Sequence, residues 1–539
     1  MNIHISLLIF IIFLTQTIEA QKYAVFFTDK TGTPYSLSHP EEFLSQRALE
    51  RREKFNIELT EDDLPVNPVY LKQIEEKGAT ILFSSKWLNC TLVHCDAAII
   101  NQITELSCVD SIVFVYPDKK NIQQLPQPPQ ITVAEHIPLK KYDPFYGNAC
   151  NQIEQINGIE LHKKGYEGEG VLIAVLDGGF CNANTINAFT HLYESGRLLM
   201  TKDFIEPNGD IYRSDISGHG ASVLSCMAAY LPNQMVGTAP KASYCLFRTE
   251  DTSSEYLIEE YTWVIGAETA DSIGADVINS SLIYTTYNDP TMSHSYSDMD
   301  GRTTIASVGA RKAVECGVFV CTSAGNDGNN PTWKWIGTPA DTPEALTVGA
   351  VQQDGQYASF SSIGPNAAGE QKPNVMAQGH SAAIINTEGK VTTGNGTSYS
   401  SPVICGMVAC LLQASPFTKP EELKTLIETS SNLYATPSYQ MGYGIPDFYK
   451  VFKALPVIEH SKCNNILIYP NPVSDILTVK SNKHLKKVVF YDITGQLVDE
   501  QLFVSYNYKI FTHKLSAGMY VIHFYDDNDM VGCAKFIKE

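Results

Sequence analysis

The sequence predicts an α/β protein built around a doubly wound, mostly parallel sheet, with a smaller α+β unit before it and a small β-sandwich after it. Between about residues 146 and 455, short apolar runs typical of buried strands alternate with helical stretches. Residues 21–118 alternate strands and helices on a smaller scale, and short strands separated by turn residues fill 463–539. The chain has 539 residues, which is too long for a single hydrophobic core.

The first twenty residues differ in character from the rest of the chain. An apolar stretch at 5–14 is followed by Ile18-Glu19-Ala20, an arrangement typical of a secretory signal peptide that is cut before Gln21. The segment before the apolar stretch carries His4 but no Lys or Arg. No later run is long enough to span a bilayer, so we expect no transmembrane helix once residues 1–20 are removed.

Residues 21–118 have the pattern of a small α+β sandwich. A strand at 23–27 precedes a helix dense in charge at 41–54, and strands and helices then alternate up to a closing strand at 109–116. The stretch 119–145 is rich in Pro and Gln at its centre and has no helix or strand pattern there. We interpret it as a linker and processing zone.

Two residues with acid and base chemistry follow at the ends of regular elements. Asp177 ends the apolar run 171–176, as expected when a buried parallel strand delivers a side chain at its carboxyl end. His219 lies between two glycines, ahead of small and apolar residues that predict a helix over 221–230. Each setting would place a polar side chain at an edge of the sheet.

A hydroxyl and an amide have similar settings. Ser398 precedes a helix predicted over 403–414, with Pro402 near its first turn, and a nucleophile at a helix N-terminus is favoured by the helix dipole and by free N–H groups. Asn326 follows the second buried strand, predicted over 317–322. A serine hydroxyl is a weak nucleophile until a base takes its proton, and the imidazolium that then forms needs a carboxylate to orient it.

The segments around Asp177, His219, Asn326 and Ser398 occur in the order acid, base, amide, nucleophile, and together they resemble the subtilisin-like serine peptidases (subtilases, peptidase family S8). The resemblance covers roughly residues 145–455. It implies a subtilisin-like catalytic domain and peptide hydrolysis through an acyl-enzyme intermediate. In that mechanism the Asn326 amide and the Ser398 backbone N–H stabilise the developing oxyanion.

Four positions depart from the family pattern. Gly178 follows the acid where Ser or Thr is usual, and Ala221 stands where the motif around the base usually has Thr. Tyr399 and Ser400 replace the usual Met and Ala after the nucleophile. No reacting group is lost, so these departures concern the rate of the reaction and not its class.

A fifth match is the segment 279–282, which resembles the family strand that pairs with the extended backbone of the substrate. The resemblance implies that Ser281 and Leu282 line one wall of the cleft, although Ile283 stands where Gly is usual. The opposite wall, with part of the pocket for the residue before the cut, would then be formed by Ser323, Ala324 and Gly325.

A polar insertion at 284–302 follows this strand. It contains Asp289, Asp298 and Asp300, with Gly301 directly after, and such oxygen ligands could hold a structural Ca²⁺. We favour the alternative, a solvated acidic loop. The chemistry itself requires no cofactor and no catalytic metal.

The C-terminal segment 463–539 predicts a small β-sandwich. Three of its elements resemble the sorting domain of the type IX secretion system: Tyr469-Pro-Asn-Pro472, Asp492–Gln496 and Leu515–Tyr520. The resemblance implies that the type IX machinery is a partner, and that the chain passes the periplasm and the outer membrane to be secreted or held at the cell surface.

Residues 21–118 look like the inhibitory propeptide that precedes many subtilase domains, and an unrelated binding module is the alternative. The order of signal, propeptide, peptidase and sorting domain predicts a secreted serine endopeptidase made as a zymogen. Its expected partners are protein or peptide substrates and its own propeptide. The rival hypothesis is a catalytically inactive cell-surface binding protein that keeps the subtilase scaffold.

Charge and cysteine content exclude other classes. The formal net charge of −20, without a basic stripe, argues against nucleic acid as a partner. The thirteen cysteines are an odd number and show no zinc-site spacing, so no metal site is predicted from them. Cys90 with Cys95 and Cys316 with Cys321 are candidate disulfides, and the sequence leaves their pairing open.

Overall fold

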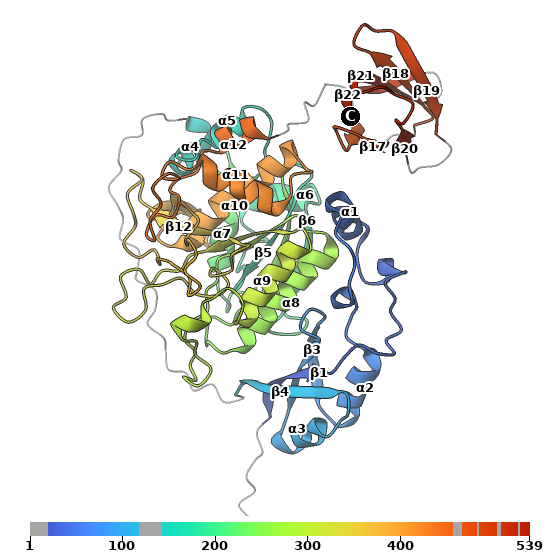
Figure 1. The fold of residues 1–539 in the computed structure, drawn as a ribbon. Helices are drawn as coiled ribbons and strands as arrows, with labels where there is room; N and C mark the ends of the chain where they lie inside the picture. The colour runs from blue at the N-terminus through green and yellow to red at the C-terminus, as the bar shows by residue number, and fades with distance from the viewer. Residues whose placement is uncertain (1–19, 118–142, 456–465, 482–484, 504–507, 527–528) are drawn as a thin grey trace, which may run out of the picture. The chain divides into compact units, whose positions relative to one another are not determined.

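A computed structural model describes residues 20–117, 143–455, 466–481, 485–503, 508–526 and 529–539 (Figure 1). The expected signal peptide, apart from Ala20, and most of the expected linker 119–145 lie outside the described residues. The chain divides into two compact units, Met1–Pro456 and Val457–Glu539. Each unit is described by itself.

A seven-stranded sheet lies at the centre of the larger unit, and every neighbouring pair of strands in it is parallel. Most of its strands are buried along their whole length, because apolar runs such as Leu172–Asp177 have helices on both faces. The predicted mostly parallel sheet is therefore confirmed. In spatial order its strands are β13 (Val375–Gln378), β12 (Leu346–Val351), β11 (Phe319–Ser323), β10 (Val277–Ser280), β5 (Leu172–Asp177), β9 (Ser243–Arg248) and β6 (Leu198–Asp203).

Helices cover both faces of this sheet (Figure 1). Helix α8 (Ile258–Ile273) packs against α9 (Ile305–Glu315), and α7 (His219–Ala228) packs against α10 (Thr397–Ala414). The strand order reverses at β5, which has β9 on one side and β10 on the other. Open sheets of this kind bind ligands at the carboxyl ends of the strands beside such a reversal. Other elements of this domain include α11 (Pro420–Ser430), α12 (Phe448–Ala454) and the hairpin β14 (Ala382–Ile385) with β15 (Val391–Gly394).

The N-terminal part of the larger unit has a four-stranded antiparallel sheet and three helices, of which the second and third pack on the sheet and the first packs against α8. Tyr23, Val25 and Phe27 of its first strand pack with the second and third helices. The alternate residue Ala24 belongs instead to the core that includes α8. The elements are β2 (Thr80–Ser85), β3 (Cys90–Cys95), β1 (Gln21–Phe27), β4 (Val109–Tyr116), α1 (Gln46–Phe55), α2 (Pro68–Glu76) and α3 (Ala97–Thr104).

Glu268 on α8 connects this N-terminal sheet to the large domain through hydrogen bonds. Its carboxylate accepts hydrogen bonds from the backbone N–H groups of Lys86 at 2.9 Å and Trp87 at 3.0 Å, and from the Ser85 hydroxyl. All of these groups are buried. A buried carboxylate is tolerated because donors satisfy its oxygens.

Asp271, one turn further along α8, is the centre of a buried ionic cluster. It accepts hydrogen bonds from Arg51, from Arg52 at 3.0 Å and from Lys86 at 3.0 Å. Arg52 also donates to Asp63 at 2.7 Å. Arg51 and Arg52 lie on α1, in the helix that the sequence predicts to be dense in charge. Each is only 2% exposed.

The C-terminal unit contains two antiparallel sheets with an apolar core, so the predicted β-sandwich is confirmed. Within the described ranges, no helix combines the length and the apolar character needed to cross a membrane. Cys90, Cys95, Cys316 and Cys321 are free thiols, so neither candidate disulfide forms. The strands of the two sheets are β16 (Ile466–Tyr469), β17 (Ile476–Ser481) and β20 (Tyr508–Phe511), and β19 (Leu497–Leu502), β18 (Lys487–Asp492), β21 (Gly518–Asp526) and β22 (Asp529–Lys538).

Candidate active site

Asp177 and His219 form a hydrogen-bonded pair at the carboxyl edge of the sheet. Asp177 is the last residue of β5 and is completely buried, and His219 is the first residue of α7, with about a third of its side chain exposed. The Nδ1 atom of His219 lies 2.9 Å from Asp177 Oδ1, which also accepts the Gly178 backbone N–H at 2.8 Å. The pairing leaves the other ring nitrogen of His219 available for a further partner.

The electrostatics of this pair favour a charged imidazole. Burial opposes protonation of the ring, but the charge and the hydrogen bond of Asp177 outweigh burial, so the pKa of His219 is raised. The second oxygen of Asp177, Oδ2, is buried and has no hydrogen-bond partner among the residues that the structure describes. A carboxylate in this state is well suited to stabilise a neighbouring imidazolium.

Ser398 is the second residue of helix α10 and is 7% exposed. Its hydroxyl lies 3.5 Å from the carbonyl oxygen of Ser281, and the Ser281 hydroxyl donates to the Ser398 carbonyl at 3.0 Å. Across the described residues, no hydrogen bond joins Ser398 to His219. Catalytic hydrogen bonds of this kind are often long without substrate and tighten only when it binds.

Asn326 lies beside the start of the same helix, because Thr397 holds its side chain. Its Oδ1 atom accepts the Thr397 backbone N–H at 2.9 Å and the Thr397 hydroxyl at 3.0 Å. A Cβ atom added at Gly396 would lie 3.7 Å from the Ser398 backbone nitrogen and 3.8 Å from Asn326 Nδ2. The two donors that the sequence proposes for an oxyanion therefore both lie within 3.8 Å of the same point.

The predicted substrate-binding residues lie on two strand ends that flank Ser398. Ser281 and Leu282 follow β10 and are largely buried, and Ser281 contacts Ser398 directly. On the other side, the Gly325 backbone N–H donates to the Thr397 hydroxyl at 3.2 Å. Two further predicted substrate-binding residues directly precede Gly325. They are Ser323, which ends β11, and Ala324, which is completely buried.

Gly325 requires glycine for both conformation and space. Its φ of +101° lies in the left-handed region, where a side chain is strained, and an added Cβ would come within 2.8 Å of the Ser362 hydroxyl. The strand therefore turns away from the sheet at this residue. This turn delivers Asn326 to the site.

Each of the three aspartates of the insertion accepts hydrogen bonds from backbone N–H groups within a local turn. Asp289 accepts the Thr291 backbone N–H at 2.9 Å, and Asp298 accepts the Ser295 backbone N–H at 2.7 Å. Asp300 accepts the N–H groups of Arg302 and Thr303, each at 2.8 Å. In the described part of the chain, these carboxylates do not converge as a group that could hold a metal ion. A structural calcium therefore stays an untested expectation.

The described residues do contain one group of three potential metal ligands, Asp63, Asp271 and Cys316. These carboxylates already bind Arg52, which donates to both of them. Protein cations therefore occupy the position that a metal ion would take. This group belongs to the interface between the N-terminal domain and α8, and not to the catalytic cleft.

Sequence reasoning missed two residues of the site. Thr397 orients Asn326, and nothing in its sequence pattern distinguishes that role from a turn. Glu250 follows β9, and a Cβ atom added at Gly178 would lie 3.9 Å from its Oε1 atom. Burial and the Asp177 charge raise the pKa of Glu250 to about 7, against the opposing effect of His219. The sequence signal that could have identified Glu250 is its position just after a buried strand, which ends at the same edge of the sheet as β5.

Three family profiles match the chain in the order that the sequence predicts. The Subtilase family matches residues 168–444, the Bacteroidota Peptidase S8 propeptide domain matches 22–130, and the secretion system C-terminal sorting domain matches 467–539. Together these matches cover most of the residues after the expected signal peptide.

Two curated relatives are similar to the same region. Subtilisin NAT from Bacillus subtilis subsp. natto is 31% identical over 333 residues, which cover 61% of this chain and 77% of that protein. Subtilisin from Bacillus pumilus is 31% identical over 296 residues, which cover 54% of this chain and 94% of that protein. Among solved structures, MycP1 with its N-terminal propeptide removed is 21% identical and has a TM-score of 0.42, covering 56% of this chain and 96% of its own.

Proposed function

Because this chain belongs to the subtilase family, we propose that it is a serine endopeptidase in which Asp177, His219 and Ser398 form the catalytic triad. The propeptide and the sorting domain on either side make it a secreted protease produced as a zymogen. The observation that carries the catalytic assignment is the 2.9 Å contact between His219 Nδ1 and the fully buried Asp177, together with the position of Ser398 in the first turn of helix α10.

In the proposed mechanism, Ser398 Oγ attacks the carbonyl carbon of the scissile peptide bond while His219 takes its proton through Nε2. Asp177 holds the imidazole by Nδ1 and stabilises its positive charge. The tetrahedral intermediate collapses when His219 donates the proton to the leaving amine, and an acyl-enzyme on Ser398 remains. Water, activated by the same histidine, then hydrolyses this ester and restores the serine.

Negative charge develops on the substrate carbonyl oxygen in both steps. The proposed donors are the side-chain amide of Asn326 and the backbone N–H of Ser398. The two hydrogen bonds from Thr397 to Asn326 Oδ1 support this role. Because they hold the amide oxygen, they direct the amide nitrogen, which is the donor, away from Thr397 before any substrate arrives. Preorganised donors of this kind stabilise a transition state without a cost of reorganisation during the reaction.

The substrate is proposed to lie extended between the two strand ends that flank Ser398. Ser281 and Leu282 would form one wall, and Ser323, Ala324 and Gly325 the other. Main-chain pairing along such walls binds the backbone of many sequences, while side-chain pockets supply preference. Protein and peptide substrates are therefore expected.

The rival hypothesis is an inactive subtilase scaffold that only binds. A fluorophosphonate probe separates the two, because it reacts with a serine hydroxyl only when a base activates it. Labelling of the mature protein that is lost in Ser398→Ala supports the enzyme. Absence of labelling in a folded mature protein supports the binding protein.

The sorting domain directs the protease to the cell surface or the extracellular space. The partners of the chain therefore include its own propeptide and the secretion machinery. We further propose that the mature protein crosses the periplasm and the outer membrane on this route, as the type IX resemblance implies.

A further inference from the structure

The loop after β9 carries a carboxylate to the edge of the proposed catalytic cleft. Glu250 lies two residues beyond the end of β9, and its Oε1 atom is 3.9 Å from the position of a Cβ added at Gly178, directly after Asp177. The same Cβ would lie 2.5 Å from Thr252 Cγ2. The loop therefore packs against the backbone that follows the triad acid, and glycine at 178 makes room for it.

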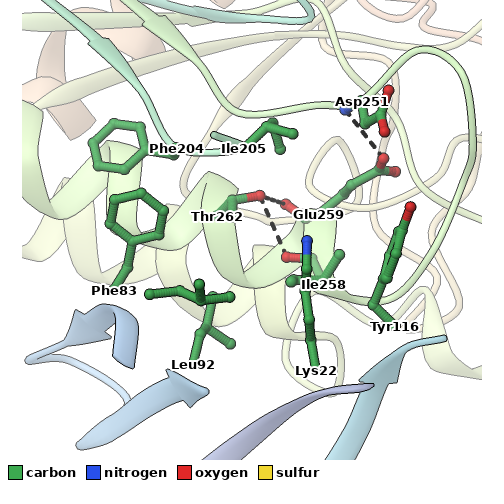
Figure 2. Close-up of a pocket in the computed structure, with 11 residues that line it drawn as sticks. Lys22, Phe83, Leu92, Tyr116, Phe204, Ile205, Asp251, Ile258, Glu259 and Thr262 are labelled. Atoms are coloured by element: carbon green, nitrogen blue, oxygen red, sulfur yellow. Dashed lines mark hydrogen bonds between the residues drawn. The ribbon is translucent and has the colours of Figure 1, made fainter. Parts of the chain in front are cut away.

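Two further glutamates lie close to Glu250. Glu259, in the first turn of α8, is 1% exposed and accepts the Asp251 backbone N–H at 3.2 Å (Figure 2). Burial and then the charges of Glu255 and Glu250 raise the pKa of Glu259. Glu255 is fixed in turn, because its backbone N–H donates to the Asn288 side chain at 2.6 Å. Three acidic residues thus lie on the loop after β9 and in the first turn of the helix that follows it.

Several buried polar atoms around these acids lack hydrogen-bond partners within the described ranges. They are the Tyr284 hydroxyl, the Thr249 hydroxyl and Glu259 Oε2, all on residues that are at least 99% buried. Burial, and then the charges of Glu250, Glu259, Glu255 and Glu260, raise the pKa of Tyr284. Its hydroxyl therefore lies within electrostatic reach of these acids. Buried polar groups are almost always hydrogen-bonded, so this set points to a polar, positively charged ligand.

The arrangement fits an organic cation better than a metal ion. Among the described residues, three potential ligand atoms lie within 4.8 Å of one another only at Asp63, Asp271 and Cys316, so the three glutamates do not form a close group of this kind. A guanidinium group spreads five N–H donors over a plane and can bridge separated acceptors. The N-terminal domain already presents such a charge, because Lys22 lines a pocket together with Asp251 and Glu259 (Figure 2).

We propose that Glu250, Glu255 and Glu259 form a subsite that binds an arginine or lysine side chain of the substrate. This inference rests on the proposed function and deepens it by naming a substrate class. Tyr284 lies three residues beyond Ser281, which contacts Ser398, and a strand rises about 3.3 Å per residue. This separation favours a position that is not directly beside the scissile bond, and we assign it to the side before the cut.

The first test needs no variant. The mature enzyme is incubated with a proteome-derived peptide library, and its cleavage sites are mapped by mass spectrometry. The expected result is enrichment of Arg and Lys at one position, at least two residues before the cut. A profile without basic enrichment on that side overturns the proposal.

The second test compares matched variants on two peptides that differ only by Arg or norleucine at the mapped position. Glu259→Gln should lower the ratio of kcat/KM between the two peptides about ten- to a hundredfold, mainly through KM. Glu421→Gln, the same substitution at an exposed position on α11, should leave the ratio unchanged. Glu250→Lys should reverse the preference toward a Glu-containing peptide.

The outcomes separate this proposal from the proposed function. An enzyme that cleaves both peptides equally well, with Ser398 labelled by a fluorophosphonate, keeps the function and overturns the subsite. A folded protein that cleaves neither peptide and is not labelled overturns both. If Ca²⁺ raises the Tm of the wild type but not of Glu259→Gln, and basic preference is absent, the acids hold a metal instead.

Discussion

Arg51 of the N-terminal domain and Asp271 of helix α8 form an ion pair that is almost completely buried, with side-chain exposures of 2% and 0%. Arg51 also donates to the backbone carbonyl of Ala275 at 2.5 Å, so the pair ties the end of α8 to the preceding domain. Charges are seldom buried to this extent unless they are paired and hydrogen-bonded. The position of the N-terminal domain on α8 therefore depends on specific side chains as well as on apolar contact.

Arg51→Met should weaken the folded zymogen. Removing one partner of a buried pair leaves the other charge uncompensated, which costs about 3–5 kcal/mol. The free energy of unfolding should be measured on the precursor that also carries Ser398→Ala, so that no processing intervenes. Lys72→Met is the control, because Lys72 and Glu76 are both well exposed and such pairs contribute about 0–1 kcal/mol. If the free energy of unfolding falls by the same amount in the two variants, burial of Arg51 has no special importance for stability.

Ser398→Ala should abolish peptide hydrolysis, because the substitution removes the covalent route. The precursor should also remain uncut if maturation is autocatalytic. Electrophoresis of the purified variant, incubated alone, tests the second point. A mature-sized product from that sample would show that another protease performs the cut.

The rate should fall on the acid side as His219 becomes protonated, since an imidazolium cannot accept the Ser398 proton. Asp177 raises the pKa of His219, so the midpoint of this fall should lie above about 6.5, the ordinary value. The raised pKa also means that protonated His219 stabilises the fold. This contribution is fully present below about pH 6.5 and is lost as the pH rises through the pKa of His219 in the folded protein. Activity and this part of the stability should thus change in opposite directions. A flat profile of kcat/KM between pH 5 and 8 would contradict His219 as the base.

Asn326→Ala should lower kcat while KM changes little, because the amide binds the developing oxyanion more strongly than the ground-state carbonyl. Loss of one such donor in a subtilisin costs about 10²–10³ in kcat. Thr397→Val should cause a smaller loss, since it removes the hydroxyl donor at 3.0 Å but keeps the backbone donor at 2.9 Å. Both variants should be assayed after separate removal of the propeptide. A tenfold rise in KM at unchanged kcat would instead assign Asn326 to substrate binding.

Deletion of 463–539 should block surface delivery without removing activity. Every proposed catalytic residue lies in the other compact unit, and residues from Val457 onward form a unit of their own. Fractionation of cells should find the truncated chain in the periplasm. Its normal appearance in the medium would be incompatible with a sorting role for this domain.

The reacting residues could be predicted because each has a strong local pattern. A run of apolar residues ends at Asp177, and such a run is recognisable without tertiary information. The helix starts were less predictable. Helix α7 begins at His219 and α10 at Thr397, whereas the sequence predicts starts at 221 and 403. Glycine and serine have weak helix propensity, so packing decides these first turns.

Other features depend on residues that are far apart in the sequence. Arg51 and Arg52 lie in a helix that the sequence predicts only to be dense in charge, and their main acceptor, Asp271, is 219 or more positions away. The charged helix is also shorter than predicted, because Ser45 caps it and it begins at Gln46 instead of 41. Glu250 has a recognisable place after a strand, but its neighbours come from another helix and from the insertion.

Glu268 and Asp271 are interior residues of the zymogen only while the N-terminal domain is present, because Ser85, Lys86, Arg51 and Arg52 supply their donors. When that domain leaves, three cations leave with it, and water must solvate the two carboxylates. One side of α8 then changes from a dry core element to an acidic outer surface. Precursor and mature protease consequently present different electrostatic faces to their surroundings, although this helix has the same sequence in both.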